Sequence, residues 1–327
     1  MATNIEWTDA TWNPSTGCTK VSPGCAHCYA ETLTKRYAGS PGWPETFLPW
    51  VPGNDTVVLH PDRLDAPLHW RTPRRVFVDS MSDLFHDDVP FEFIDRVFAV
   101  MALTPQHTYQ VLTKRPARMR EYLTAWEAGE AQALKRVAAL VWAMRHRPPI
   151  GVTYRDVPSG TPWPLPNFHA GVTVENQRWA DERIPILLDT PAAVRFISAE
   201  PLLGPVDLGL NRWVRIANTI RSSSLASARL LVEPGVYRAD SNPFGALSIN
   251  RLGIMPGEFE RLPNPDWVIC GGESGPKHRR LDAEWALNLR LQCQGSTAFF
   301  MKQLGGARPG NKLEDLPEDL RVREYPR

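Results

Sequence analysis

Three of the five cysteines in the chain lie close together, at Cys18, Cys25 and Cys28 in the segment "NPSTGCTKVSPGCAHCYAE". Thiols at this density are typical of a metal centre. Glycine and proline flank the cysteines in "STGC" and "SPGC", and both residue types favour the tight turns of a loop that wraps a metal group. The spacing therefore predicts a metal-binding loop with three cysteine ligands.

The fourth ligand distinguishes two kinds of metal centre. A structural zinc ion usually has four protein ligands, so zinc would require His27, Cys270 or another distant group. A [4Fe–4S] cluster bound by three cysteines leaves one iron open. That iron can bind the amino and carboxylate groups of S-adenosylmethionine, whose reductive cleavage yields a 5′-deoxyadenosyl radical. Both centres fit the spacing, and unligated cysteines are a third alternative.

The composition is that of an ordinary globular protein in a reducing compartment. The chain has 327 residues, of which 43% are hydrophobic and 22% charged, and its formal net charge is +1. An odd number of cysteines, three of them crowded together, is a poor disulfide framework. The N-terminal segment lacks the basic and apolar regions of a signal peptide, and the apolar run at 137–144 is too short to cross a bilayer. We therefore expect a soluble, cytoplasmic protein without membrane association.

Six short apolar segments, rich in Val, Ile and Phe, each end in a polar or glycine-rich turn. They lie at 74–83, 108–115, 169–176, 194–204, 266–274 and 298–306. Such nearly continuous apolar strands predict a parallel sheet that is covered on both faces. Helical patterns alternate with them, at 90–104, 119–146 and 282–293, the last with Asp282 as its N-cap. The alternation predicts an α/β fold, a complete or partial (β/α) barrel, and we expect a partial one of about six parallel strands.

Two regions interrupt this alternation. Residues 155–168 are proline-rich and predict a loop. Residues 205–265 form too long a connection for a simple crossover, and we expect an insertion or lid there. The expected organisation is an N-terminal part of the barrel at 1–204, the insertion at 205–265, and a C-terminal part of the barrel at 266–327.

The predicted strands end, one after another, in polar, ionisable or glycine residues. These are Asp79, Ser80, Asp83, Lys114, Arg115, Glu175, Asn176, Glu200, Gly271, Gly272, Glu273 and Ser274. Since α/β barrels build their active sites at the carboxyl ends of their strands, we expect these residues and the cysteine segment to form one site. Taken alone, each carboxylate among them fits equally well as a loop residue with a structural partner, and each cation fits equally well as a surface residue.

Six motifs together resemble the phage-associated radical-SAM-like proteins, a family of long-unknown function that is widespread in bacteria and phages. They are "WNPSTGCTKVSPGCAHCYAE", "VFVDSMSDLFH", "VLTKRP", "GVTVEN", "RFISAEPLLG" and "WVICGGESG". The likeness runs from about Trp7 to Gly306, apart from the insertion. The cysteine spacing, C-x6-C-x2-C, is wider than the common radical SAM pattern C-x3-C-x2-C. The resemblance implies a partial barrel of the radical SAM type, with a [4Fe–4S] cluster on the three cysteines at its mouth.

The resemblance also implies how the chain would hold S-adenosylmethionine. The resemblance implies that Ser80 or Asp83 contacts the amino group and that Lys114 or Arg115 contacts the carboxylate. The ribose hydroxyls would be held by Glu175, Asn176 or Glu200. His27 would lie near the adenine, and the adenine and ribose would lie along Gly271, Gly272, Glu273 and Ser274.

Basic runs indicate the class of substrate. They lie at 71–75, 113–120, 134–147 and 277–280, and two of them directly follow predicted strand ends. A basic rim around a radical site fits a polyanion, and nucleic acid is the obvious one. Solvated helix faces are the alternative explanation of each run. We hypothesise repair of a thymine photoproduct-type DNA lesion, or modification of a nucleobase.

A weaker likeness, to spore photoproduct lyase, concerns Cys270. That radical SAM enzyme reverses a thymine–thymine lesion and uses a cysteine within its barrel as hydrogen-atom donor. Cys270 would be the catalytic counterpart here, and an ordinary buried cysteine is the alternative. A reductase or flavodoxin-type protein would donate electrons. The competing functions are a radical SAM enzyme for a peptide or small metabolite, and a non-catalytic zinc or iron–sulfur protein that binds nucleic acid.

Overall fold

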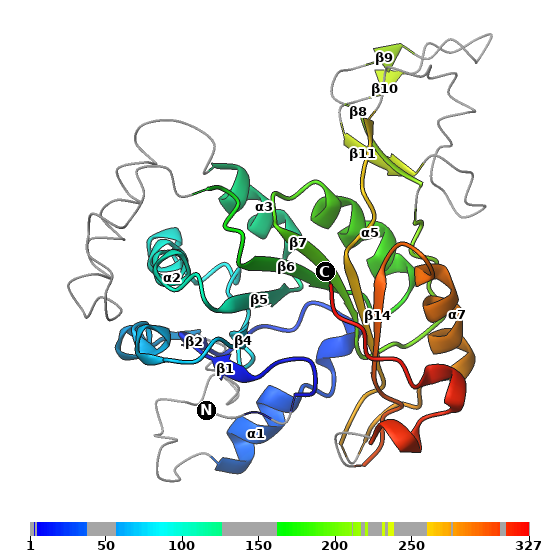
Figure 1. Ribbon diagram of the computed structural model, residues 1–327, viewed down its shortest axis with the longest axis horizontal. Coiled ribbons are helices and arrows are strands. Elements are labelled where there is room, and N and C mark those ends of the chain that lie inside the picture. The colour runs from blue at the N-terminus through cyan, green and yellow to red at the C-terminus, as the bar shows by residue number, and fades with distance from the viewer. Residues whose placement is uncertain are drawn as a thin grey trace.

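The computed structural model describes residues 3, 5–37, 57–125, 162–210, 212–216, 220–221, 231–232, 235–238, 260–275, 277–307 and 312–326. Its centre is a seven-stranded, all-parallel sheet that curls into a half-barrel (Figure 1). In sheet order, the strands are β1 (Ala10–Trp12), β4 (Arg75–Val78), β5 (Thr108–Thr113), β6 (Phe168–Thr173), β7 (Val194–Ala199), β13 (Trp267–Gly271) and β14 (Ala298–Gln303). The predicted α/β partial barrel is confirmed. It has one strand more than expected, because β1 is too short for an apolar pattern to reveal it.

The two faces of the sheet carry different sets of side chains, since successive residues of a strand point to opposite faces. In β13, Val268 and Cys270 belong to the main core between the sheet and its helices. Trp267 and Ile269 belong instead to a cluster on the inner face of the half-barrel. The buried members of that cluster are Trp7, Phe77, Phe196, Trp267, Ile269 and Phe300. These aromatic rings fill the inner face and leave the carboxyl ends of the strands for polar side chains.

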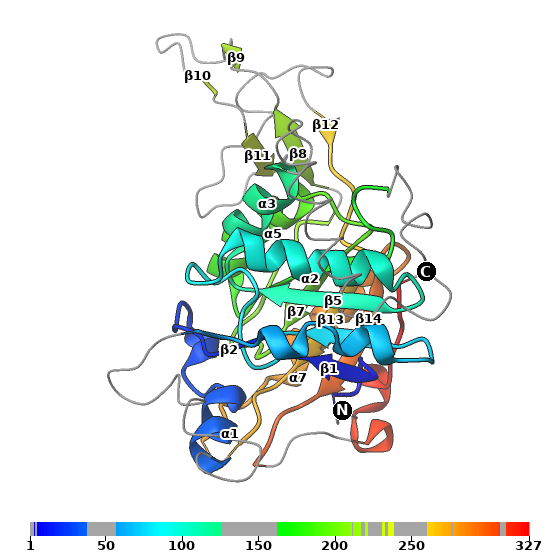
Figure 2. The ribbon, with the colours of Figure 1, turned by 90° about the vertical axis from the view of Figure 1, so that its left-hand side faces the viewer.

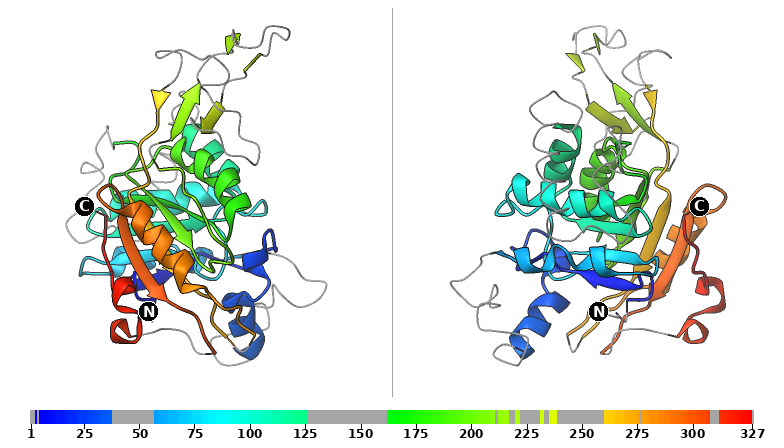
Figure 3. Two further views of the ribbon diagram at one scale, coloured as in Figure 1. Left: turned by 90° about the vertical axis from the view of Figure 1, so that its right-hand side faces the viewer. Right: turned by 60° about the vertical axis from the view of Figure 1, so that its left-hand side comes forward.

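In the described part of the chain, four helices cover the outer face, as Figures 2 and 3 show for α2 beside β5 and for α7 beside β14. They are α2 (Phe91–Leu103), α3 (Pro116–Ala125), α5 (Gln177–Leu188) and α7 (Ala283–Cys293). The predicted helices at 90–104 and 282–293 are confirmed, and the Asp282 carboxylate accepts a hydrogen bond from the Glu284 amide at 3.0 Å. Of the helix expected at 119–146, α3 covers the first part, and residues 126–146 lie outside the described residues. We did not predict α5, which contains Pro185, or the N-terminal α1.

The N-terminal segment leads from β1 to the carboxyl edge of the sheet. After β1 the chain forms β2 (Ser15–Thr16), which pairs antiparallel with β3 (Val58–Leu59), and the turn η1 (Pro23–Cys25). α1 (Tyr29–Tyr37) follows directly. The remaining short helices are η3 (Pro61–Arg63), η4 (Ala66–His69), η5 (Leu313–Asp315) and η6 (Glu318–Leu320).

The region 205–265 contributes a small antiparallel sheet at the end of the molecule opposite α1 (Figure 1). Its strands are β8 (Trp213–Ile216), β11 (Gly235–Arg238) and β12 (Glu260–Arg261), and β9 (Ile220–Arg221) pairs separately with β10 (Leu231–Val232). Arg215 Nε donates to the Asp189 carboxylate at 2.6 Å, and Asp189 lies between α5 and the start of β7. The small sheet of β8, β11 and β12 therefore contacts the amino end of the half-barrel sheet, whereas Asp207 of the same region hydrogen-bonds to Gln177 at the start of α5. Residues 162–167 form no helix or strand, as expected for the proline-rich loop, while its last residue, Phe168, begins β6.

Within the described ranges, no helix combines the length and the apolar character that crossing a membrane requires.

Candidate functional site

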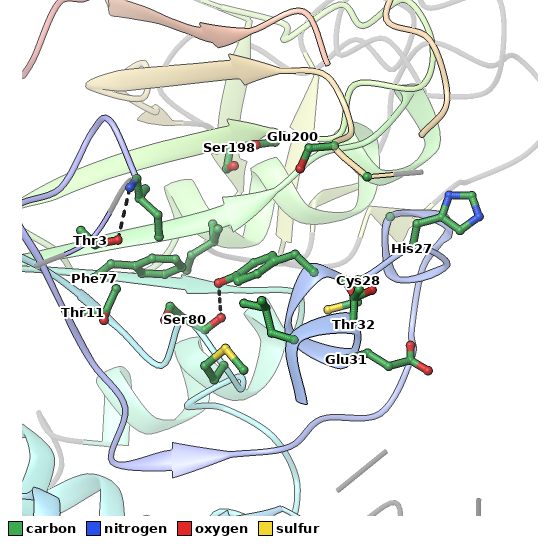
Figure 4. Close-up of a pocket in the computed structure, with 18 of the residues that line it drawn as sticks. Thr3, Thr11, His27, Cys28, Glu31, Thr32, Phe77, Ser80, Ser198 and Glu200 are labelled. Atoms are coloured by element: carbon green, nitrogen blue, oxygen red, sulfur yellow. Dashed lines mark hydrogen bonds between the residues drawn. The ribbon is translucent and has the colours of Figure 1, made fainter. Parts of the chain in front are cut away.

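The carboxyl ends of the strands border a cavity of about 1640 Å³. Figure 4 shows side chains from several strands and from the N-terminal segment around it. The residues of the seven-stranded sheet that line it are Thr11, Trp12, Phe77, Leu112, Thr173, Ser198 and Lys302. A smaller cavity of about 140 Å³ lies beside it, lined by all three clustered cysteines. The structure thus brings the cysteine segment and the strand ends together, as the sequence predicts.

The cysteine loop, residues 17–28, is anchored to the end of β4 at its first residue. Gly17 has a φ of 97°, a backbone conformation that residues other than glycine rarely adopt. Its amide donates to the Met81 carbonyl at 3.1 Å, and its carbonyl accepts from the Ser82 hydroxyl at 2.6 Å. All three cysteines of the loop are half-buried free thiols. The loop therefore presents its thiols toward the sheet rather than to open solvent.

The electrostatic surroundings of two of these thiols differ. Burial and the Asp83 carboxylate raise the pKa of Cys18 to about 12, although Arg115 Nη1 donates to its sulfur at 3.5 Å. Burial would also raise the pKa of Cys25, but the Lys114 charge and hydrogen bonds from the loop hold it below the ordinary value. Metal ligation requires a thiolate, so Cys25 is the thiol better prepared to bind.

The three thiols line one small cavity and form a donor set that could hold a metal group. Within the described ranges, no group of three or more His, Cys, Asp or Glu side chains is placed to hold a single metal ion. Of the two predicted fourth zinc ligands, Cys270 is buried in the core. The contact between His27 Nδ1 and Glu273 leaves Nε2 of the same ring available for a metal.

Asp83 positions the two cations that follow β5. Its carboxylate accepts from the Lys114 amide and from Arg115 Nη1, both at 3.1 Å. It also accepts from the Thr113 hydroxyl at 2.7 Å and from the Phe85 amide at 3.0 Å. Asp83 and Arg115 line the smaller cavity, whereas Lys114 lines both cavities. Asp83 is therefore fully engaged within the protein, and Lys114 is the cation that faces the larger cavity.

The turn after β4 also faces the larger cavity. Ser80 lines it, the Ser80 hydroxyl donates to Asn13 Oδ1 at 3.1 Å, and the Tyr29 hydroxyl donates to the Ser80 carbonyl (Figure 4). The preceding residue, Asp79, has φ of 55° and is buried. Its carboxylate accepts from the Ser15 amide at 2.9 Å and from the Ser15 hydroxyl at 2.8 Å. Asp79 thus holds the strand that leads into the cysteine loop.

Asp79→Asn is expected to remove a pH dependence of stability. Burial is the main cause that raises the pKa of Asp79 from 3.8 to about 7. Between these values the folded chain keeps a proton that the unfolded chain releases. The free energy of unfolding therefore falls as pH rises from about 4 to about 7, by up to about 1.4 kcal/mol per pH unit. Asparagine keeps the hydrogen bonds to Ser15 and tolerates the positive φ. Urea unfolding of both proteins across this range measures the effect, and a difference between them that does not change with pH would contradict it.

Glu200 and Lys302 form an ion pair in the cavity wall. Lys302 Nζ donates to Glu200 Oε1 at 2.6 Å, although β13 separates their strands. A Cβ on Gly271 would lie 3.2 Å from Glu200 Cδ, and one on Gly272 would lie 2.2 Å from the Leu304 carbonyl oxygen. These glycines, predicted to admit the adenine or ribose, also leave room for protein groups. Gly272 also lines the cavity, whereas Gly271 does not.

Three further predicted residues do not line either cavity. Glu175 is buried in an ion pair with Arg183, and the Asn176 side chain accepts from the Trp179 amide as the N-cap of α5. Cys270 lies in the main core, on the side of the sheet that faces the helices. Because side chains alternate along β13, Cys270 points away from the cavity, which does not favour its predicted role as hydrogen-atom donor.

Besides Gly272, three of the predicted adenine-side residues line the larger cavity: His27, Glu273 and Ser274. His27 Nδ1 lies 2.9 Å from Glu273 Oε2. Burial would raise the pKa of Glu273, but hydrogen bonds from Arg279 and His27 lower it to about 2. This carboxylate is therefore ionised under all ordinary conditions.

The residues of the larger cavity that sequence reasoning missed include Thr173, Ser198, Lys302 and Tyr29. The first three lie within strands rather than after them. Each is a polar residue next to apolar neighbours in β6, β7 or β14, and this is a signal that we could have used. Tyr29 begins a helix that we did not predict.

The family comparison covers this whole site. A family model described as "Protein of unknown function (DUF5131)" matches residues 2–319. The chain belongs to this family. No curated protein and no solved structure matches it. The DUF5131 match spans the half-barrel and the cysteine loop together.

Proposed function

We propose that this DUF5131 protein is a radical SAM enzyme that acts on nucleic acid. One observation carries the proposal: a loop with three cysteines lies at the carboxyl edge of a parallel half-barrel, beside a cavity lined by polar strand residues. Barrels of this kind build their active sites at that edge. The resemblance of the six motifs to radical-SAM-like proteins agrees with this arrangement.

Cys18, Cys25 and Cys28 would hold a [4Fe–4S] cluster, and no protein group would bind the fourth iron. When bound there with S-adenosylmethionine, the cluster supplies a 5′-deoxyadenosyl radical. Arg115 donates to the Cys18 sulfur, and the Lys114 charge favours the thiolate of Cys25. These two cations offset the negative charge that three thiolates bring together.

The larger cavity would hold S-adenosylmethionine. Lys114 hydrogen-bonds to the Thr173 hydroxyl at 3.3 Å, and within the described ranges no carboxylate forms an ion pair with its ammonium. It is therefore suited to the methionyl carboxylate. The other predicted contacts that line the cavity are His27, Ser80, Glu200, Gly272, Glu273 and Ser274.

The size and charge of the cavity favour a second, anionic molecule. Pockets for one small ligand have volumes of roughly 300–1,000 Å³, and this cavity, at about 1640 Å³, is larger. Seven Lys or Arg and five Asp or Glu side chains are among its described lining residues. Four of the lining cations, Lys20, Lys35, Arg36 and Lys277, are exposed to solvent. We propose a nucleobase as target, with a thymine photoproduct-type DNA lesion as the first substrate to test, and a reductase or flavodoxin-type electron donor.

Anaerobic reconstitution tests the proposal. We expect a brown, oxygen-sensitive protein with about four irons and four sulfides per chain. With S-adenosylmethionine and dithionite it should produce 5′-deoxyadenosine. A colourless protein that binds one zinc ion would end the radical proposal. A protein that cleaves S-adenosylmethionine but neither binds DNA nor turns over lesion-containing oligonucleotides would rule out the nucleic-acid substrate alone.

A further inference from the structure

The cysteine loop has almost no regular structure of its own, and two carboxylates from the sheet hold it. Its one internal element is the three-residue turn η1. Glu175 follows β6, and Glu273 follows β13, two strands away in the sheet. Each carboxylate contacts the loop on one side and an arginine on the other.

Glu175 contacts the loop just before Cys25. The Ser22 hydroxyl donates to Glu175 Oε1, and a Cβ on Gly24 would lie 2.6 Å from that same oxygen. The other carboxylate oxygen accepts from Arg183 Nη1 at 3.0 Å, and both side chains are fully buried. Arg183 therefore fixes the carboxylate, and the carboxylate packs directly against the loop backbone.

Glu273 and its partner Arg279 contact the loop on the two sides of Cys25. Glu273 Oε2 lies 2.9 Å from His27 Nδ1. Arg279 donates to Glu273 Oε1 at 2.6 Å and to Oε2 at 3.0 Å. The same arginine also donates to the Pro23 carbonyl at 2.9 Å. This second pair of charged residues thus holds the loop at Pro23 and His27.

We infer that Glu175 and Glu273 are positioning residues that shape the cysteine loop for the metal cluster. The identity of the bound group rests on the proposed function, whereas the contacts belong to the chain itself. Their contact points enclose Cys25, and His27 precedes Cys28 directly. A loop that is already ordered has less conformational entropy to lose when it binds its ligand. The resemblance places Glu175 at the ribose, and the structure assigns it this different role.

Gly24→Ala tests the inference without removing a thiol or a charge. Its methyl group would lie 2.6 Å from Glu175 Oε1, so the loop must move off the carboxylate. We expect amide hydrogen exchange in residues 18–28 of the metal-free protein to become at least about tenfold faster. After anaerobic reconstitution we expect less iron per chain and an altered electron paramagnetic resonance spectrum of the reduced cluster. Ser22→Ala should act in the same direction, and Ser22→Thr, which keeps the hydroxyl, should not.

Gly204→Ala is the matched control, because its Cβ would lie 3.8 Å from Asn176 Cβ, an ordinary contact. It should leave exchange, iron content and spectrum unchanged. Exchange in Gly24→Ala at the wild-type rate, together with an unchanged spectrum, would overturn the inference. If the wild-type chain takes up no iron while Gly24→Ala still loosens the metal-free loop, the proposed cluster fails and the Glu175 contact stands as a device that orders the loop.

Discussion

Replacing any one of Cys18, Cys25 and Cys28 by alanine is expected to abolish the brown colour of the reconstituted protein. It should also lower the rate of 5′-deoxyadenosine production by at least about 10³-fold, which corresponds to about 4 kcal/mol in activation free energy. A cluster bound by three cysteines has no spare protein ligand. In the described part of the chain, the other cysteines, Cys270 and Cys293, are buried and lie in the main core, where they cannot substitute. Iron and sulfide analysis, the visible spectrum and chromatography of the nucleoside product measure the result.

Cys293→Ala is the control for these variants. Cys293 ends α7 and is 1% exposed, so its loss is a small core truncation far from the cysteine loop. This variant should keep its iron and its production of 5′-deoxyadenosine. Iron retained at wild-type stoichiometry in the Cys25→Ala protein would contradict the assignment of the three ligands, whatever the activity.

Arg183→Met is expected to lower the free energy of unfolding by about 3–5 kcal/mol, because it leaves the Glu175 carboxylate buried without its cation. Both side chains of this ion pair are 0% exposed. Arg183 also donates to the Thr173 carbonyl at 2.7 Å, and its guanidinium lies 4.0 Å from the centre of the Trp179 ring. Urea or thermal unfolding of the metal-free protein measures the change without any contribution from metal binding.

Two further variants distinguish the stability cost of the unpaired buried charge from the cost of losing any ion pair. Lys35→Met breaks the exposed ion pair with Glu31 and should cost less than about 1 kcal/mol. Adding Glu175→Gln to Arg183→Met removes the stranded charge and should recover part of the lost stability. A loss in Arg183→Met no larger than that in Lys35→Met would show that the pair contributes little.

Local patterns predicted much of the fold. The apolar segments gave the positions of six strands, and Pro90 and Asp282 marked where two helices begin. α5 was missed because its pattern is interrupted by Pro185, which ordinarily argues against a helix interior. Residues 38–56 and 126–161, which include part of one predicted helix and loop, lie outside the described residues.

The candidate site was predicted as a region more accurately than as a set of contacts. Parallel strands all end at the same edge of a sheet, so the residues that follow correctly predicted strands lie close together. Several of their partners come from distant parts of the chain: Glu200 meets Lys302 beside Gly271, and Glu175 meets Ser22 of the cysteine loop. Spacing along the sequence carries no information on such pairs.

The sequence by itself determined the parallel α/β architecture, the cysteine loop and the edge at which it lies, because these depend on local apolar runs and on the common direction of the strands. Only the tertiary structure decided which side chains face the cavity. A parallel sheet covered on both faces has apolar residues on each, so its strands show no alternation from which to read the inner side. That is why Cys270, which we expected to point into the barrel, lies in the outer core, whereas Lys302, which we did not single out, lines the cavity.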